Sequence, residues 1–235
     1  MKLRAIALFA LVTLAGLSRA AAITIMDQIG PDSSYTPGWI YASQETVGSP
    51  LFEVVTADDF TTTAAGYIIT KVQAVIGFFK EAGPAAGPND VYAYRMEIYS
   101  SPAAAGSSLA GDVAHYLFGP EQLQVTPWAV DFANQHLVTI TGLNLALTPN
   151  QTYWIGLIAV MPLQGLGWSG IGASTYAGLP SNNSSIQANP NGGFGNGPWW
   201  SLQANFAYRI EAVPEPSTLA LLGLGVLALA RRRRK

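Results

Sequence analysis

The feature that most constrains the fold of this chain is an alternation of apolar and polar residues with a period of two. It runs through residues 68–79, 92–100 and 200–210. Because successive side chains of a β-strand point to opposite faces, this period predicts strands with one buried and one solvated face, as in antiparallel sheets. The predicted buried faces are Ile68, Val72, Ala74, Ile76 and Phe78; Tyr92, Tyr94, Met96 and Ile98; and Trp200, Leu202, Ala204, Phe206, Tyr208 and Ile210.

Residues 152–160 are apolar on both faces, which predicts a central strand covered on both sides. Shorter strands are predicted within 113–118, 125–132 and 137–141. Turn-forming residues separate these segments, and residues 161–199 are expected to form a long loop. No long amphipathic helix is predicted between the strands. The pattern therefore predicts an all-β fold, an antiparallel β-sandwich in one domain that spans residues 23–212.

The C-terminal tail follows a different plan. Pro214, Glu215 and Pro216 precede an apolar run over residues 219–230, and the chain closes with five cations, Arg231, Arg232, Arg233, Arg234 and Lys235. A helix of 12 residues is about 18 Å long, which is less than the hydrocarbon thickness of a bilayer. The cations are expected to remain cytoplasmic. This tail predicts a short transmembrane helix over 217–230 with a basic stop at 231–235.

The order of proline-rich motif, short apolar helix and arginine cluster resembles the PEP-CTERM protein-sorting signal of Gram-negative bacteria. The resemblance covers residues 213–235, a tail also known under an ice-binding-protein C-terminal label. It implies processing by an exosortase, a membrane transpeptidase that removes the tail and passes the protein to the cell surface or extracellular matrix. Residues 57–60, 147–155 and 206–210 are similar to the globular domains that precede such signals, which implies a jelly-roll-like sandwich.

The N-terminus agrees with export. Lys2 and Arg4 form a basic start, residues 5–17 are apolar, and small residues follow. This is the pattern of a secretory signal peptide, predicted over residues 1–22. Signal peptidase is expected to cut after Ala22 or after Ala20. The protein is thus predicted to be held transiently in the inner membrane by its C-terminus before it reaches the cell surface or matrix.

Composition excludes several function classes. Eight of the 12 basic residues and one of the 14 acidic residues lie outside 23–213, which leaves a net charge of −9 for the exported part. A domain with this negative charge repels phosphate backbones. No nucleic-acid partner is therefore predicted. The chain has no cysteine, which excludes disulfides, thiolate metal sites and a cysteine nucleophile. His115 and His136 lack zinc-ligand spacing.

Carboxylates are the remaining candidates for chemistry. Two of them about 5 to 9 Å apart suffice for glycoside hydrolysis, and the candidates are Glu53, Asp58, Asp59, Glu81, Glu97, Asp112, Glu121 and Asp131. We interpret Asp58 and Asp59 as a turn into the strand that begins near Tyr67. The alternative is a Ca²⁺ site, which would need further oxygen ligands from other loops. No other cofactor is predicted.

Six tryptophans are a further clue. Trp128, Trp154 and Trp200 lie in or beside apolar patterns and are predicted to be core residues. Trp39, Trp168 and Trp199 follow glycine or proline and are predicted to lie in loops. There they either stack on sugar rings or fold back over the ends of the sandwich.

Three function classes follow. The preferred one is an exported, non-catalytic surface or matrix protein that associates with extracellular polysaccharide. The alternatives are a secreted carbohydrate-active hydrolase with paired carboxylates, and a purely structural or ice-interacting surface protein of unknown ligand. Ice binding usually needs a repeated threonine face, and residues 61–63 are a single run of threonine without a period.

Overall fold

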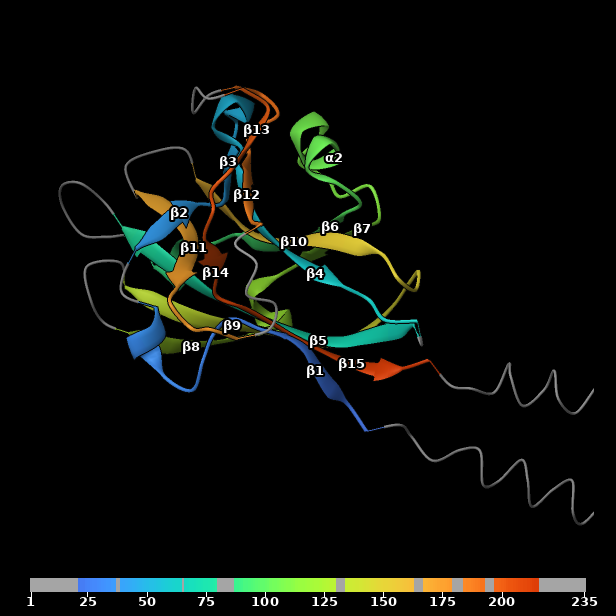
Figure 1. Ribbon diagram of the computed structural model, residues 1–235. Helices are drawn as coiled ribbons and strands as arrows, with labels where there is room; N and C mark the ends of the chain where they lie inside the picture. Colours follow the sequence, from blue (N-terminus) through green and yellow to red (C-terminus); the bar gives the residue numbers. More distant parts are fainter. Residues whose placement is uncertain are drawn as a thin grey trace, which may run out of the picture.

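The computed structural model describes residues 21–36, 39–64, 66–79, 87–129, 134–162, 167–178, 184–192 and 197–215. These residues form two β-sheets that pack around a shared core (Figure 1). The eight-stranded sheet consists of β1 (Ile23–Asp27), β15 (Tyr208–Pro214), β5 (Tyr67–Phe79), β11 (Trp168–Ser174) and β14 (Asn205–Phe206) in this order, with β2 (Ile40–Ala42), β9 (Gln135–Leu147) and β8 (Gln124–Ala129) attached to it.

The seven-stranded sheet has the order β13 (Trp199–Ser201), β12 (Ile186–Ala188), β4 (Val55–Thr61), β10 (Thr152–Pro162), β6 (Ala93–Tyr99) and β7 (Ala114–Phe118), with β3 (Gln44–Val47) beside β10. Within the described residues, every strand pair is antiparallel except β3 with β10. A short helix, α2 (Pro102–Ser107), and 3-10 turns at Ser33–Tyr35, Pro50–Phe52, Pro88–Asp90 and Pro120–Gln122 connect the strands. The all-β prediction is confirmed.

The inner faces of both sheets supply the main core. Phe60, Met96 and Ile155 of the seven-stranded sheet meet Val72 and Ile140 of the eight-stranded sheet in one buried cluster. Strand β10 is nearly buried throughout and pairs with β4 and β6, as the doubly apolar segment 152–160 predicts. Burial of apolar side chains from both sheets is the main favourable contribution to folding here, since the chain has no disulfide.

The predicted inward face of residues 68–79 is wrong at its first residue. A bulge between Ile69 and Lys71 shifts the register of β5 against β9. One extra residue reverses the alternation, so Ile69 is fully buried and Ile68 is only half-buried. After the bulge, the alternation correctly identifies the residues that face the main core: Val72, Ala74, Ile76 and Phe78. The solvated opposite face is wrong, because Gln73 and Val75 are buried as well.

The single strand predicted over residues 200–210 is also wrong. The segment is divided into β13, which pairs with β12, β14, which pairs with β11, and β15, which pairs with β5. Gln203, two residues after the end of β13, has a φ of 49°, a left-handed conformation at the point where the chain crosses toward the other sheet. The alternation survives the crossing, because Phe206, Tyr208 and Ile210 all reach the main core.

The outer face of β6 is covered rather than solvated, which contradicts the one-face-wet prediction for residues 92–100. Glu97 and Tyr99 are fully buried, whereas Tyr92, predicted to point inward, is 60% exposed. Helix α2 lies over this face, and Tyr99, Ala105 and Ile158 form a second apolar cluster there. The interval 161–199 is likewise not one loop, because it contains β11, β12 and the first residue of β13.

The two predicted addresses lie mostly outside the described residues, which include only residues 21–22 of the signal peptide and residues 213–215 of the tail. The predicted transmembrane helix over 217–230 is outside them as well. Across the described ranges, no helix has the length and apolar character needed to cross a membrane.

Candidate functional site

Strand β5 runs between two ends of the domain that carry different predicted sites. Its first residue, Tyr67, is the Cα partner of Pro214, the first residue of the predicted sorting motif. Its last residue, Phe79, is the partner of Trp168, one of the tryptophans predicted to contact sugar. A strand of 13 residues spans about 40 Å, so the sorting motif and Trp168 lie at opposite ends of the molecule.

The end that carries Trp168 is aromatic. The indole ring of Trp168 meets the ring of Phe52 edge to face, with centroids 6.3 Å apart. Phe79 lies beside it on β5. All three rings are half-buried, so each keeps an accessible part. Sequence reasoning missed Phe52 and Phe79; the apolar end of the 68–79 pattern was the signal for Phe79.

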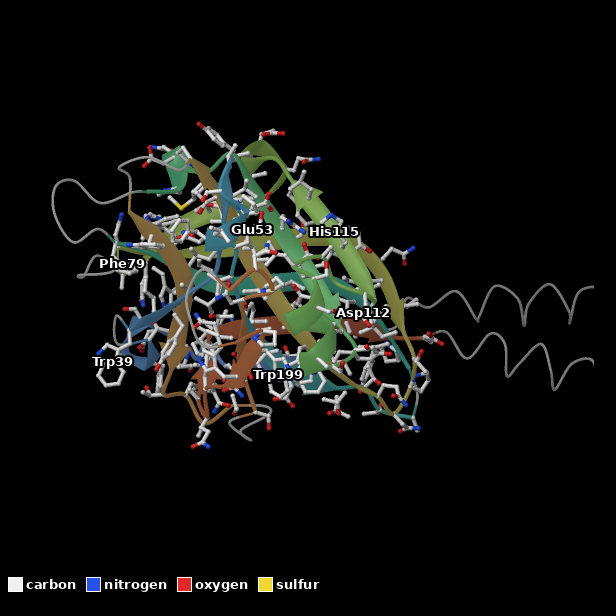
Figure 2. The ribbon with its side chains drawn as sticks, turned by 90° about the horizontal axis from the view of Figure 1, so that it is seen from above. Trp39, Glu53, Phe79, Asp112, His115 and Trp199 are labelled. Atoms are coloured by element: carbon white, nitrogen blue, oxygen red, sulfur yellow. The ribbon has the colours of Figure 1, made fainter. Side chains whose placement is uncertain are left out.

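Trp39 is the most exposed large apolar side chain described, at 73% of its surface. It precedes β2, and its backbone oxygen accepts a hydrogen bond from Ala173 N at 2.7 Å, which fixes its backbone against β11. Figure 2 shows Trp39 and Phe79 on the side of the molecule opposite the one where the described chain begins and ends, at residues 21 and 215. Because Ala173 is five residues from Trp168 along β11, the two tryptophan positions are about 16 Å apart.

Trp199 has a different position. It belongs to β13 and is 39% exposed. Its ring lies against α2 so closely that a Cβ added to Gly106 would be 2.6 Å from its Cδ1 atom. Trp199 therefore packs against α2, away from Trp39 (Figure 2). The prediction that Trp168 and Trp199 lie in loops is wrong, since both begin strands.

The three tryptophans predicted to be core residues are half-buried rather than central. The Trp128 indole donates a hydrogen bond to Thr36 Oγ1 at 2.9 Å, and the Trp154 indole donates to the Ser184 carbonyl at 3.3 Å. Each ring packs on an apolar cluster while its N–H reaches a polar partner, which is the usual arrangement of an indole at the edge of a core.

Asp58 and Asp59 are not a turn before the strand near Tyr67, as interpreted from the sequence. Both lie inside β4 and are buried, at 1% and 3% exposure. Asp58 Oδ2 accepts a hydrogen bond from Phe206 N at 2.7 Å, and Asp58 Oδ1 accepts one from Asp59 N at 3.0 Å. The Asp58 carboxylate thus accepts the backbone hydrogen bond from Phe206 that a neighbouring strand would otherwise accept. This bond connects β4 of the seven-stranded sheet to β14 of the eight-stranded sheet.

Burial, with a smaller contribution from the neighbouring Asp59, raises the pKa of Asp58 to about 7, although the N–H groups of Phe206 and Asp59 oppose the rise. Close by, the Tyr208 hydroxyl donates to the Thr56 carbonyl at 2.8 Å and accepts from Leu157 N at 3.0 Å. Burial holds the pKa of Tyr208 well above its usual value. Asp58 and Tyr208 form a polar link between β15, β14 and the seven-stranded sheet.

Glu97 is the most enclosed of the other candidate carboxylates. Its oxygens contact His115 Nδ1 at 2.7 and 2.9 Å, Arg95 Nε at 2.9 Å and the backbone N–H of Gly111 at 2.7 Å. Arg95 also pairs with Glu45. These contacts occupy both oxygens of a fully buried carboxylate, which gives Glu97 a structural position beneath the outer surface of β6.

The remaining candidate acids do not join this group. Glu53 bonds Asn191 at 3.0 Å, and burial, with the neighbouring Glu45, raises its pKa. Asp112 accepts a hydrogen bond from Ser100 N at 2.9 Å, and Glu121 lies in an exposed 3-10 turn. Glu81 and Asp131 lie outside the described residues.

For the predicted Ca²⁺ site, the described residues offer no group of three or more His, Asp or Glu side chains positioned to hold a metal ion. Of the two imidazoles, His115 contacts Glu97, whereas His136 packs its ring against Phe78 with centroids 5.9 Å apart. Burial lowers the pKa of His136.

The sorting end is built from β15 and its two neighbours. On one side Ala212 pairs with Ile23 of β1, and on the other side Pro214 pairs with Tyr67 of β5. The first residue after the predicted signal peptide therefore lies near the start of the sorting motif, so the described chain begins and ends on the same side of the domain (Figure 1). Ala22 and Glu215 are described; Ala20, Pro216 and the cations 231–235 lie outside the described residues.

Comparison with known proteins identifies this tail. A family model described as the PEP-CTERM protein-sorting motif matches residues 212–235. The match begins inside β15 and includes the proline motif, the apolar run and the cations. No curated protein matches the chain. The tail thus indicates an exported protein that is sorted by an exosortase, whereas the match does not extend to residues 1–211.

Proposed function

We propose that this chain is a non-catalytic protein of the cell surface or extracellular matrix that contacts exopolysaccharide with the aromatic end of a jelly-roll-like β-sandwich. The observation that carries the proposal is the position of Trp39, 73% exposed, at the end of the domain away from the sorting motif. Signal peptidase and the exosortase are its partners during export. Processing leaves the aromatic end directed away from the membrane.

An exposed indole supports ligand contact on energetic grounds. Burial of a tryptophan side chain removes roughly 150 to 250 Å² of mostly apolar surface from water, which is energetically favourable. A ring that is exposed in the free protein can still gain this free energy when a ligand covers it. The apolar C–H face of a sugar ring can cover the indole without desolvating the hydroxyl groups. Trp168, Phe52 and Phe79 offer a second aromatic position about 16 Å along β11, where another unit of the same polymer can bind.

Charge supports a neutral polymer. The exported part carries a net charge of −9, and the described basic side chains Lys71, Arg95 and Arg209 are paired with carboxylates. An anionic polysaccharide would be repelled by this surface at low ionic strength. The polymer that fits is a neutral or weakly charged polysaccharide of the surrounding matrix.

Retention of the processed protein on polysaccharide tests the proposal. We expect Trp39→Ala to weaken binding to matrix polysaccharide and to neutral glucans and galactans about tenfold or more, because loss of one aromatic stack removes on the order of 1.4 kcal/mol. Tyr92→Ala is the matched control, since Tyr92 is 60% exposed but lies on a different element, next to β6. Equal retention of wild type and Trp39→Ala on every polymer that is bound, or no retention of wild type on any of them, would refute the proposal.

A further inference from the structure

The sorting signal of this chain overlaps its folded domain. The family match begins at Ala212, whereas β15 continues to Pro214. No linker residue separates the sheet from the motif. Val213 pairs with Ile68 and Pro214 pairs with Tyr67, so the first residues that the sorting enzyme recognises are also rungs of the eight-stranded sheet.

The contact continues one residue beyond the strand. Glu215 N donates to the Gly66 carbonyl at 3.5 Å, a long hydrogen bond. The side chain of Glu215 lies over Gly66, where an added Cβ would be 3.0 Å from its Cδ atom. Gly66 also has a φ of 69°, a conformation that favours glycine. The bare Cα of this turn therefore provides the space that Glu215 occupies.

The two neighbours of β15 end at different points. Pairing with β1 ends at Ala212, opposite Ile23, whereas pairing with β5 continues through Pro214. Ala212 is fully buried, but Val213 and Pro214 are only half-buried. Residues 213–215 can therefore separate from β5 without disturbing β1 or the core. Such terminal openings require far less free energy than global unfolding.

A transpeptidase and a sheet cannot hold the same backbone at once. During cleavage, the carbonyl carbon of the broken peptide bond passes to a nucleophile of the enzyme and then to an acceptor amine or water, and the amine of the tail leaves with a proton. Each step requires access to the backbone around the bond. Backbone groups that are paired with β5, with side chains that cover Gly66, do not offer that access.

We propose that the folded domain gates its own sorting: the exosortase acts on the motif only after residues 213–215 have separated from residues 66–68 of β5. The inference rests on the exosortase step of the proposed function and is independent of polysaccharide binding. The point of separation is the bond between Ala212 and Val213, because Ala212 is held by both neighbouring strands.

A reversible cross-link tests this gate. Val213 and Ile68 are direct cross-strand partners, and the chain has no cysteine, so Ile68→Cys with Val213→Cys can form one disulfide without competition. In full-length protein expressed with its exosortase, we expect the oxidised pair to be processed at least tenfold more slowly than wild type in a pulse-chase immunoblot. Dithiothreitol should restore processing. Each single cysteine variant is a matched control and should be cut at the wild-type rate.

Insertion of Gly-Ser-Gly-Ser between Val213 and Pro214 gives an independent readout. It frees the motif from the sheet without a cross-link, and we expect processing to be several-fold faster than in wild type. Cleavage of the oxidised pair at the wild-type rate, or an unchanged rate after the insertion, would overturn the gate. Wild-type protein that stays uncut would instead count against sorting itself, and polysaccharide retention plays no part in either readout.

Discussion

At the scale of single residues, Asp58 has the least usual environment described. An interior carboxylate is unfavourable when ionised, yet this one accepts two backbone hydrogen bonds, from Phe206 and Asp59. Strand β14 is only two residues long, and Asp58 satisfies the N–H of Phe206 there. Asp58 thereby stabilises the crossing from β13 to β15, at the cost of a raised pKa.

This pKa predicts how stability depends on pH. Because the pKa rises from 3.8 to about 7 on folding, the folded state binds the proton more tightly than the unfolded state. The resulting stabilisation is complete below pH 4 and is lost as the pH rises to about 7. It amounts to on the order of 4 kcal/mol. We expect Asp58→Asn, which does not titrate, to remove most of this decline in urea denaturation of the processed protein measured from pH 4 to pH 8, and to leave the part that comes from Glu53, whose pKa is also raised by burial.

Two other groups with shifted pKa values, His136 and Asp32, help to distinguish the contribution of Asp58. Burial lowers the pKa of His136, which makes stability rise with pH over part of the same range, and the comparison of variant with wild type cancels this contribution. Hydrogen bonds from Ser34 lower the pKa of the exposed Asp32, so its titration is confined to more acidic solution. Asp32→Asn should therefore keep the decline. If Asp58→Asn keeps it as well, the assignment to Asp58 is incorrect.

At the scale of elements, α2 covers part of the outer face of the seven-stranded sheet and contacts its edge strand β13. Ser101 Oγ accepts a hydrogen bond from Ala104 N at 3.1 Å and caps α2. The helix places Ala105 over Tyr99 and Ile158, and the Trp199 ring lies against Gly106. Glycine inside a helix normally lowers stability, so its presence here reflects the space that Trp199 needs.

A double-mutant cycle checks this contact. Gly106→Ala should lower the free energy of unfolding by about 1 to 2 kcal/mol, because the new Cβ displaces the Trp199 ring. In a Trp199→Ala background the same change should cost less than in wild type and be close to neutral, since the gain in helix propensity then opposes only the contact of the new Cβ with the Pro198 carbonyl oxygen at 3.2 Å. The measurement is urea denaturation of all four proteins. Equal effects of Gly106→Ala in both backgrounds would show that ring and helix are uncoupled.

At the scale of the whole molecule, the described chain begins and ends on one side, whereas Trp39, Phe79 and Trp168 lie on the other (Figure 2). The domain is therefore polarised along β5 over about 40 Å. While the tail remains in the membrane, this arrangement places the turn around Gly66 near the bilayer and Trp39 away from it.

Quenching by lipid-attached quenchers measures this orientation. A dye attached to Ala64→Cys, an exposed position in the turn before β5, should be quenched strongly in vesicles that hold the uncut protein. A dye attached to Trp39→Cys should be quenched weakly. The absence of native cysteine makes both labels specific. Equal quenching at the two positions, or stronger quenching at residue 39, would contradict the polarised arrangement.

Strands were predictable where the whole segment lies in one sheet and its apolar and polar residues alternate without interruption. Residues 152–160 meet this condition and form the covered strand β10, as predicted. Residues 68–79 and 200–210 do not, because a bulge at Ile69 and a left-handed Gln203 change the partner or the phase within the segment. Such local breaks depend on which strands lie opposite, and a single strand's sequence does not contain that information.

The all-β class, the lack of disulfides and the sorting tail can be read from the amino-acid sequence, because each depends on composition or on residues that are close together in the chain. That Asp58 and Glu97 are buried structural carboxylates, and that Trp199 packs on a helix, is visible only once the chain is folded. Folding also places Trp39 away from the sorting motif, which is itself part of the sheet. The physical reason is that burial and pairing arise between strands far apart in sequence, whose order and register no local pattern specifies.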